Sequence, residues 1–136
     1  MTSSGSTEAG APASPPPPAA ARVIAVVKDL FFVARIRETA RLAGVPLDFA
    51  RDPAALDAAL ATDARLVLLD LTGGFDYAAV FGAVEGVEPA RRPRLVAFTT
   101  HALARQTQPW HARCDRVVTK ETLTQELGTL LREGRP

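Results

Sequence analysis

Short apolar runs recur along the chain and predict the strands of a sheet. Residues 23–27 (VIAVV), 65–70 (RLVLLD) and 95–98 (LVAF) are nearly continuous in apolar residues and too short for helices. Such runs are typical of strands that are buried on both faces. Two weaker strands are predicted at 45–50, which has a proline near its start, and at 117–118.

Helical spacing fills the intervals between these runs. In the segment 30–43, Phe32, Ile36 and Ala40 fall on one stripe, and Gly44 is well placed to end the helix. Proline marks further boundaries, because it fits the first turn of a helix and disfavours the interior. The predicted helices are 30–43, one that opens at Pro53 with Asp52 as its cap, 77–84, a short one after His101 that does not run past Pro109, and 121–132 with Thr119 as its cap.

Strands and helices alternate along the chain, which predicts the α/β class with a parallel sheet covered on both faces. We expect a flavodoxin-like (β/α)5 three-layer sandwich with a five-stranded sheet in the order 2-1-3-4-5. This domain is predicted to span 22–136. Residues 1–21 are mostly small, polar or proline, and they predict a disordered tail that is locally extended at Pro15 to Pro18.

Composition and charge narrow the setting of the protein. The 136 residues carry a net charge of +1, too small a field to favour nucleic acid or an acidic membrane as the partner. The single cysteine, Cys114, excludes an internal disulfide, and no apolar run approaches the ~18 residues that span a bilayer. Because the N-terminus also lacks a secretory signal, we expect a cytoplasmic location.

Polar residues follow or end four of the predicted strands. Lys28 and Asp29 follow the first strand, Asp70 ends the third, Thr99 follows the fourth, and Lys120 comes after the fifth. The carboxyl ends of parallel strands meet at one edge of the sheet, where ligands bind. Two carboxylates, a hydroxyl and the ammonium groups of Lys28 and Lys120 are therefore predicted to converge there. Taken singly, these residues have plainer interpretations, such as a helix cap for Asp29 and a solvated surface residue for Lys120.

Four segments at these strand ends resemble one known family. They are VVKD (26–29), LVLLDLT (66–72), LVAFTTHA (95–102) and VVTK (117–120). In this order and spacing they resemble the receiver domain of bacterial two-component response regulators. The resemblance covers residues 22 to about 134 and implies a signalling module without enzymatic activity.

The resemblance implies a role for each residue at this edge. Asp70 would attack the phosphoryl group of a phosphohistidine donor and become an acyl phosphate. Thr99 and Lys120 would bind the phosphoryl oxygens. Mg²⁺ would be held by Asp29, Asp70 and the backbone carbonyl of Thr72.

Three positions depart from the family pattern. Lys28 stands where the family usually has a second acid, so the four charged residues at this edge sum to zero. If Lys28 points inward, it removes most of the field that attracts Mg²⁺; if it extends outward on its flexible stem, a weak metal site survives. The Mg²⁺ site is accordingly expected to be weak or absent. Val117 replaces an aromatic switch residue, and Glu121 replaces a proline.

Two functions remain open. The first is a stand-alone receiver-like module, because the chain ends at Pro136 directly after the last helix. It would contact a histidine kinase, a phosphotransfer protein or an assembly partner through the fourth helix, fifth strand and fifth helix, with Asp70 either phosphorylated or part of a pseudo-receiver locked by Lys28. The second is a small flavodoxin-like protein or enzyme that binds an anionic ligand with Lys28 and Lys120, in a pocket of several hundred Å³.

Overall fold

The computed structural model describes residues 22–133. Five parallel strands form one sheet in the order β2-β1-β3-β4-β5, as predicted. The predicted tail 1–21 and the last three residues of the predicted domain lie outside the described residues. The strands are β1 (Arg22–Val26), β2 (Leu47–Phe49), β3 (Ala64–Asp70), β4 (Arg94–Thr99) and β5 (Arg116–Thr119).

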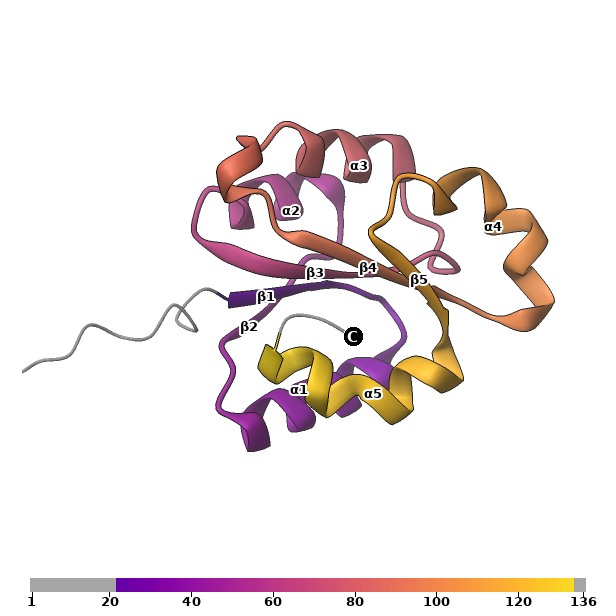
Figure 1. The fold of residues 1–136 in the computed structure, drawn as a ribbon, viewed down its shortest axis with the longest axis horizontal. Coiled ribbons are helices and arrows are strands. Elements are labelled where there is room, and N and C mark those ends of the chain that lie inside the picture. The colour runs from indigo at the N-terminus through magenta and orange to yellow at the C-terminus, as the bar shows by residue number, and fades with distance from the viewer. Residues whose placement is uncertain (1–21, 134–136) are drawn as a thin grey trace, which may run out of the picture.

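Helices cover both faces of this sheet. α1 and α5 pack on one face, and α2, α3 and α4 lie on the other, which confirms the flavodoxin-like three-layer sandwich (Figure 1). No helix within residues 22–133 has the length and apolar character needed to cross a membrane. The helices are α1 (Leu30–Ala43), α2 (Pro53–Ala59), α3 (Tyr77–Glu85), α4 (Ala104–His111) and α5 (Lys120–Glu133), with short 3-10 turns at Pro89–Arg91 and His101–Leu103.

The central strands supply side chains to two separate cores, which explains their continuous apolar sequences. Val23 and Ala25 of β1 lie in the core with α1 and α5, whereas Ile24 and Val26 lie in the core with α2 and α3. All four side chains are completely buried. A strand with two buried faces has no position for a polar side chain until it ends, so the polar residues gather at the strand ends.

Helix caps set the junctions that follow the strands. The carboxylate of Asp29 accepts hydrogen bonds from two backbone N–H groups of α1, and that of Asp52 accepts one from α2. The hydroxyl of Thr119 accepts the N–H of Thr122 in α5. Gly44 ends α1 in the left-handed conformation, at φ 69°. These predicted caps are confirmed, and they hold the ends of β1 and β5 in place beside the site.

The predicted end of the fourth helix at Pro109 is wrong, because α4 continues through this residue to His111. Proline has a helical φ, but it lacks an N–H, and its ring crowds the carbonyl four residues earlier, here that of Arg105. Pro109 and Arg105 are both exposed, so water can bond to this carbonyl in place of the missing N–H. By continuing, the helix places Trp110 against Phe81 of α3, with ring centroids 5.5 Å apart.

Candidate functional site

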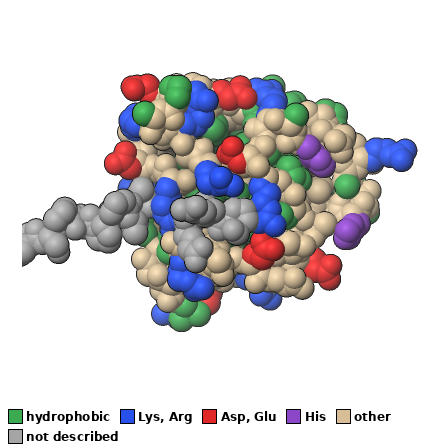
Figure 2. All heavy atoms as spheres, in the orientation of Figure 1, with side chains coloured by type: hydrophobic (Ala, Val, Ile, Leu, Met, Phe, Trp, Pro, Cys, Tyr) green, Lys and Arg blue, Asp and Glu red, His purple; other side chains and the backbone are tan. Residues whose placement is uncertain are grey.

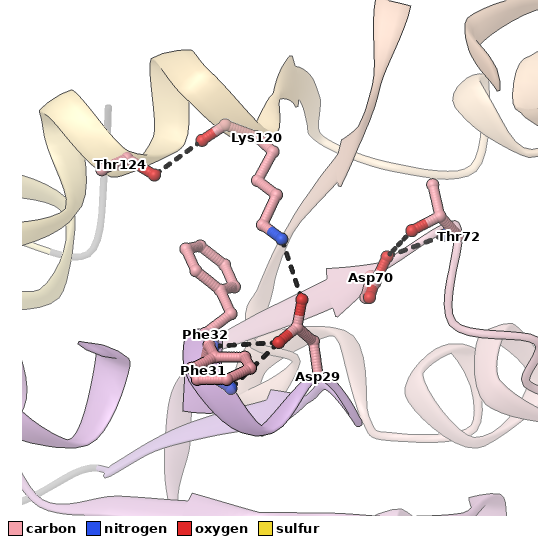
Figure 3. Close-up of polar contacts among 7 residues, drawn as sticks. All are labelled: Asp29, Phe31, Phe32, Asp70, Thr72, Lys120 and Thr124. Atoms are coloured by element: carbon pink, nitrogen blue, oxygen red, sulfur yellow. Dashed lines mark hydrogen bonds and ion pairs between the residues drawn. The ribbon is translucent and has the colours of Figure 1, made fainter. Parts of the chain in front are cut away.

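The carboxyl ends of the strands bring the predicted site residues to one edge of the sheet. In the strand register, Asp70 lies opposite Phe98, and Thr99 lies opposite Thr119. The residues that follow β1 and β5 reach the same edge, because both strands are parallel to β3 and β4. Figure 3 shows the two carboxylates and Lys120 gathered there.

Lys120 forms an ion pair with Asp29 (Figure 3). Its Nζ donates to Asp29 Oδ2 at 3.0 Å, and the ammonium also lies 5.0 Å from the centre of the Phe32 ring. Asp29 Oδ1 accepts the backbone N–H groups of Phe31 and Phe32 at 3.0 and 3.2 Å. Both oxygens of Asp29 are therefore in use. The hydrogen bond from Lys120, aided by these backbone donors, holds the pKa of Asp29 below its ordinary value.

Asp70 is buried and turns one carboxylate oxygen toward its own loop. Its Oδ1 accepts the N–H and the hydroxyl of Thr72 at 2.7 and 2.6 Å. Its Oδ2 has no hydrogen bond to any of residues 22–133. Of the four carboxylate oxygens that Asp70 and Asp29 contribute, Oδ2 of Asp70 is the one that a ligand can reach without breaking an existing bond.

Lys28 forms no ion pair with either carboxylate within the described chain. Its Nζ lies 4.5 Å from the centre of the Phe75 ring, which belongs to the loop after Asp70. An ammonium over an aromatic ring at an exposed site gains ~0.5–1 kcal/mol. Lys28 is exposed. Its charge therefore sits at the rim of the site and not between the carboxylates.

Thr99 is buried, and its hydroxyl is turned toward α4. It accepts a hydrogen bond from the Thr107 hydroxyl, with 3.1 Å between the two oxygens. The Thr107 oxygen also lies 2.8 Å from Nε2 of His111. The end of β4 is thus joined to α4 by a chain of side-chain hydrogen bonds that begins at the residue implied to bind a phosphoryl group.

The residues at this edge do not fit a strong Mg²⁺ site. Mg²⁺ requires oxygen ligands in near-octahedral geometry at ~2.0–2.1 Å. Among residues 22–133, no group of three His, Cys, Asp or Glu side chains is placed to hold a metal ion. Both oxygens of Asp29 are hydrogen-bonded, and the ionised groups of the edge have no net charge to attract a cation. This site is better suited to hold its own lysine than a metal ion.

Tyr77 organises the loop after Asp70, and the sequence analysis did not identify it. Its hydroxyl donates to the backbone carbonyl of Asp70 at 2.7 Å and accepts the N–H groups of Gly73 and Gly74 at 3.0 and 3.2 Å. Burial raises the pKa of Tyr77, so the phenol remains a donor at neutral pH. The one signal in the sequence is the Gly73-Gly74 pair, which predicted the loop but not its partner.

The two lysines line different hollows. Lys120 lines a groove of about 680 Å³ between α1 and α5. Lys28 lines a smaller hollow of about 250 Å³ beside Phe49 of β2. None of the five main hollows of residues 22–133 is lined by both lysines. The geometry therefore gives no support to an anion pocket between them.

No family model and no curated protein matches the chain. Solved structures do. The response regulator of Hahella chejuensis is 17% identical with a TM-score of 0.67, over 83% of this chain and 96% of that chain. The chemotaxis response regulator CheY4 of Vibrio cholerae is 21% identical with a TM-score of 0.64, over 82% and 98%. The chain has the receiver-domain fold.

A third similar structure with the receiver fold comes from a family of streptococcal redox sensors that evolved from two-component response regulators. It is 14% identical with a TM-score of 0.61, over 82% of this chain and 51% of that chain. Identities this low establish the fold alone. The roles implied for Asp70, Thr99 and Lys120 therefore stay predictions.

Replacing Lys120 is expected to raise the pKa of Asp29. In Lys120→Gln, the carboxylate loses its largest stabilising contact, so its pKa should rise toward the ordinary value of an aspartate. Because the folded-state pKa of Asp29 lies below the unfolded one, the pair stabilises the fold above the unfolded-state pKa, and this contribution is lost as the pH falls through the folded-state value. Carboxyl ¹³C shifts, recorded between about pH 6 and about pH 2 in metal-free buffer, measure the effect. The titration of Glu85 on α3, whose pKa is lowered by its hydrogen bond with Arg113, should not change; an unchanged Asp29 titration would contradict the assignment.

Removing the Tyr77 hydroxyl is expected to loosen the loop after Asp70. Tyr77→Phe keeps the ring but leaves the Gly74 N–H and the Asp70 carbonyl without this partner, at a cost of ~1–3 kcal/mol in the free energy of unfolding. Urea denaturation measures the loss, and hydrogen exchange should become faster at the Gly74 amide. The amide of Ala79, which bonds to the side chain of Asp76, is the internal control. Equal acceleration at both amides would refute a local role.

Proposed function

We propose that this protein is a receiver-fold signalling module that acts by protein–protein contact, and that its strand-end site works without Mg²⁺ or phosphoryl transfer. The observation that carries the proposal is the absence of net charge at this edge, where Lys28 offsets a carboxylate, and the 3.0 Å ion pair between Lys120 and Asp29 adds to it. The cation that would meet a phosphoryl group is already bound to the carboxylate that would hold the metal. Asp70 keeps one oxygen without a hydrogen bond, but its carboxylate forms no ion pair with a Lys or Arg of residues 22–133.

In this proposal, the site does not support phosphorylation mainly because it attracts Mg²⁺ too weakly. The ion pair between Lys120 and Asp29 contributes less. Lys120 and Asp29 are 40% and 39% exposed, and ion pairs of this exposure are worth ~0–1 kcal/mol. Such a pair opens readily. Mg²⁺ binding, by contrast, depends on the net charge of the edge, and Lys28 brings that charge to zero. We therefore assign the weakened attraction for Mg²⁺ to Lys28, which acts from the rim through its charge.

We propose α4, β5 and α5 as the partner surface. Hydrogen bonds from Thr99 through Thr107 connect the site to α4, and the ring of Trp110 packs on Tyr77, which holds the loop after Asp70. None of the large hydrophobic side chains exposed within 22–133 lies on this surface, so its partner would be polar. The exposed polar residues described on its helices are Arg105, Gln106, Gln108, Glu121, Gln125, Thr129 and Arg132.

The likeness to redox sensors that evolved from response regulators supports a receiver-fold module that responds to a signal other than phosphorylation. We further propose that the module comprises residues 22–136 and resides in the cytoplasm, with 1–21 as a solubilising leader.

Acidic and basic side chains are interspersed over the face drawn in Figure 2, which supports a protein partner over a nucleic acid.

The proposal is tested by adding a phosphoryl mimic to the full chain. We expect ¹⁵N–¹H correlation spectra to stay unchanged at the amides of Asp29, Asp70 and Thr99 when Mg²⁺ is added to about 10 mM, and again when beryllofluoride follows. Saturable shifts at these residues that spread into α5 would establish a working phosphoreceiver and refute the proposal.

The same titration on Lys28→Asp tests the role assigned to Lys28. This variant changes the formal charge of the edge from zero to −2, because a cation is replaced by an anion. We expect saturable Mg²⁺ shifts at Asp29 and Asp70. Lys28→Met is the matched control, because it removes the cation without adding an acid. It should bind Mg²⁺ more weakly than Lys28→Asp does. If Lys28→Asp gives no Mg²⁺ shifts, Lys28 is not the cause.

A further inference from the structure

The large hydrophobic side chains that are exposed within residues 22–133 all lie on one helix. Leu30, Phe31 and Leu42 are 75%, 91% and 72% exposed, and all three belong to α1. Monomeric proteins expose single apolar side chains commonly, but a concentration of them on one element marks an interaction surface. The outer side of α1 is therefore a candidate interaction surface.

Phe31 and Leu42 lie on the same stripe of α1. The interval between them is close to three turns, because a turn takes 3.6 residues, so the side chains project in nearly the same direction from opposite ends of the helix. Arg35 and Glu38 fall between them on this stripe and are also exposed. The outer stripe, defined as these four residues, is apolar at both ends and charged in the middle.

The order of residues along the outer stripe is self-complementary. Phe31 and Leu42 are equally far from the middle of the helix, and so are Arg35 and Glu38, on either side of the same midpoint. A second α1 laid antiparallel about a two-fold axis through this midpoint would place Phe31 against Leu42 of the other copy. It would also place Arg35 against Glu38 of the other copy. A two-fold symmetric interface requires this reciprocity.

We propose that the outer stripe of α1 is a self-association surface, on which two copies of this protein pair antiparallel. Within the chain, Glu38 is held by Arg41, whereas Arg35 forms no ion pair with any of residues 22–133. A second copy supplies the carboxylate that Arg35 lacks. The pairing uses side chains of α1 that do not belong to the strand-end site, so it does not depend on the function proposed for that site.

The dimer is expected to be weak. A helix of 14 residues is ~21 Å long, so a single helix pair buries less than the ~800 Å² per partner of a standard interface. The groove between α1 and α5 runs beside the stripe, and Phe31, Arg35 and Glu38 form one of its walls. A second helix would cover part of it. We therefore expect dissociation constants in the micromolar range.

A charge exchange across the proposed axis tests the pairing. Arg35→Glu and Glu38→Arg each place two like-charged pairs in the dimer, so each variant alone should associate at least about tenfold more weakly than the wild type. An equimolar mixture of the two variants forms two opposite-charge pairs and should associate again. Sedimentation velocity of the full chain and of the mixture measures both effects. Arg94→Glu, the same charge change at the exposed start of β4, is the matched control and should behave as the wild type.

Phe31→Asp gives an independent test that leaves the core untouched, because this side chain is 91% exposed. We expect this variant to be monomeric with an unchanged circular dichroism spectrum. A wild-type chain that stays monomeric, a dimer that ignores these variants, or a mixture that fails to associate would overturn the proposal. In a monomer, α1 resonances that shift when Pro15 to Pro18 are replaced by Ser would assign the stripe to the chain's own N-terminal segment instead. If the α1 resonances of a monomer do not shift in this variant, the outer stripe would be assigned to a different protein as its partner.

Discussion

The contact between Asp29 and the first turn of α1 determines most of what the strand-end site is able to do. This carboxylate accepts the N–H groups of Phe31 and Phe32 with one oxygen and the ammonium of Lys120 with the other. It thereby joins the start of α1 to the start of α5, two segments separated by most of the domain. A carboxylate that caps a helix and forms an ion pair at once has both oxygens engaged. Metal ligation by Asp29 therefore competes with the fold's own hydrogen bonds.

In the proposed function, this competition explains why a site that keeps Asp29, Asp70 and Lys120 differs chemically from the pattern it resembles. With a second acid in place of Lys28, the edge would be negative, and a cation would be drawn in even at the expense of the Lys120 pair. With Lys28 present, the edge has no negative charge to attract a cation, but a metal ion at Asp29 would still have to displace Lys120. In this proposal, a single change of charge at the rim is enough to alter the balance.

The sequence was sufficient for the fold and for the edge on which the residues gather, because both follow from apolar periodicity and from caps that act over a few residues. The direction of Lys28 was left open, and the reason lies in a close approach within the loop. A Cβ on Gly73 would come within 2.6 Å of the Phe75 ring, so this ring occupies its place only beside a glycine. The position of that ring, and of the ammonium above it, depends on contacts that no local pattern encodes. The roles of Tyr77 and Thr107 were missed for the same reason, since their partners lie on other elements.

α1 connects the two surfaces of this protein, because its residues contribute to both. The backbone N–H of Phe31 binds Asp29, whereas its side chain is the most exposed large hydrophobic group on the helix. The first turn of α1 is therefore shared between the strand-end site and the outer stripe. If a second copy on the stripe shifts the hydrogen bonds of Asp29, linkage requires that a ligand on Asp29 shift the pairing by the same factor. In the proposed dimer the antiparallel arrangement would place this turn of each copy beside the last turn of the other α1, so each strand-end site would lie next to one end of the interface.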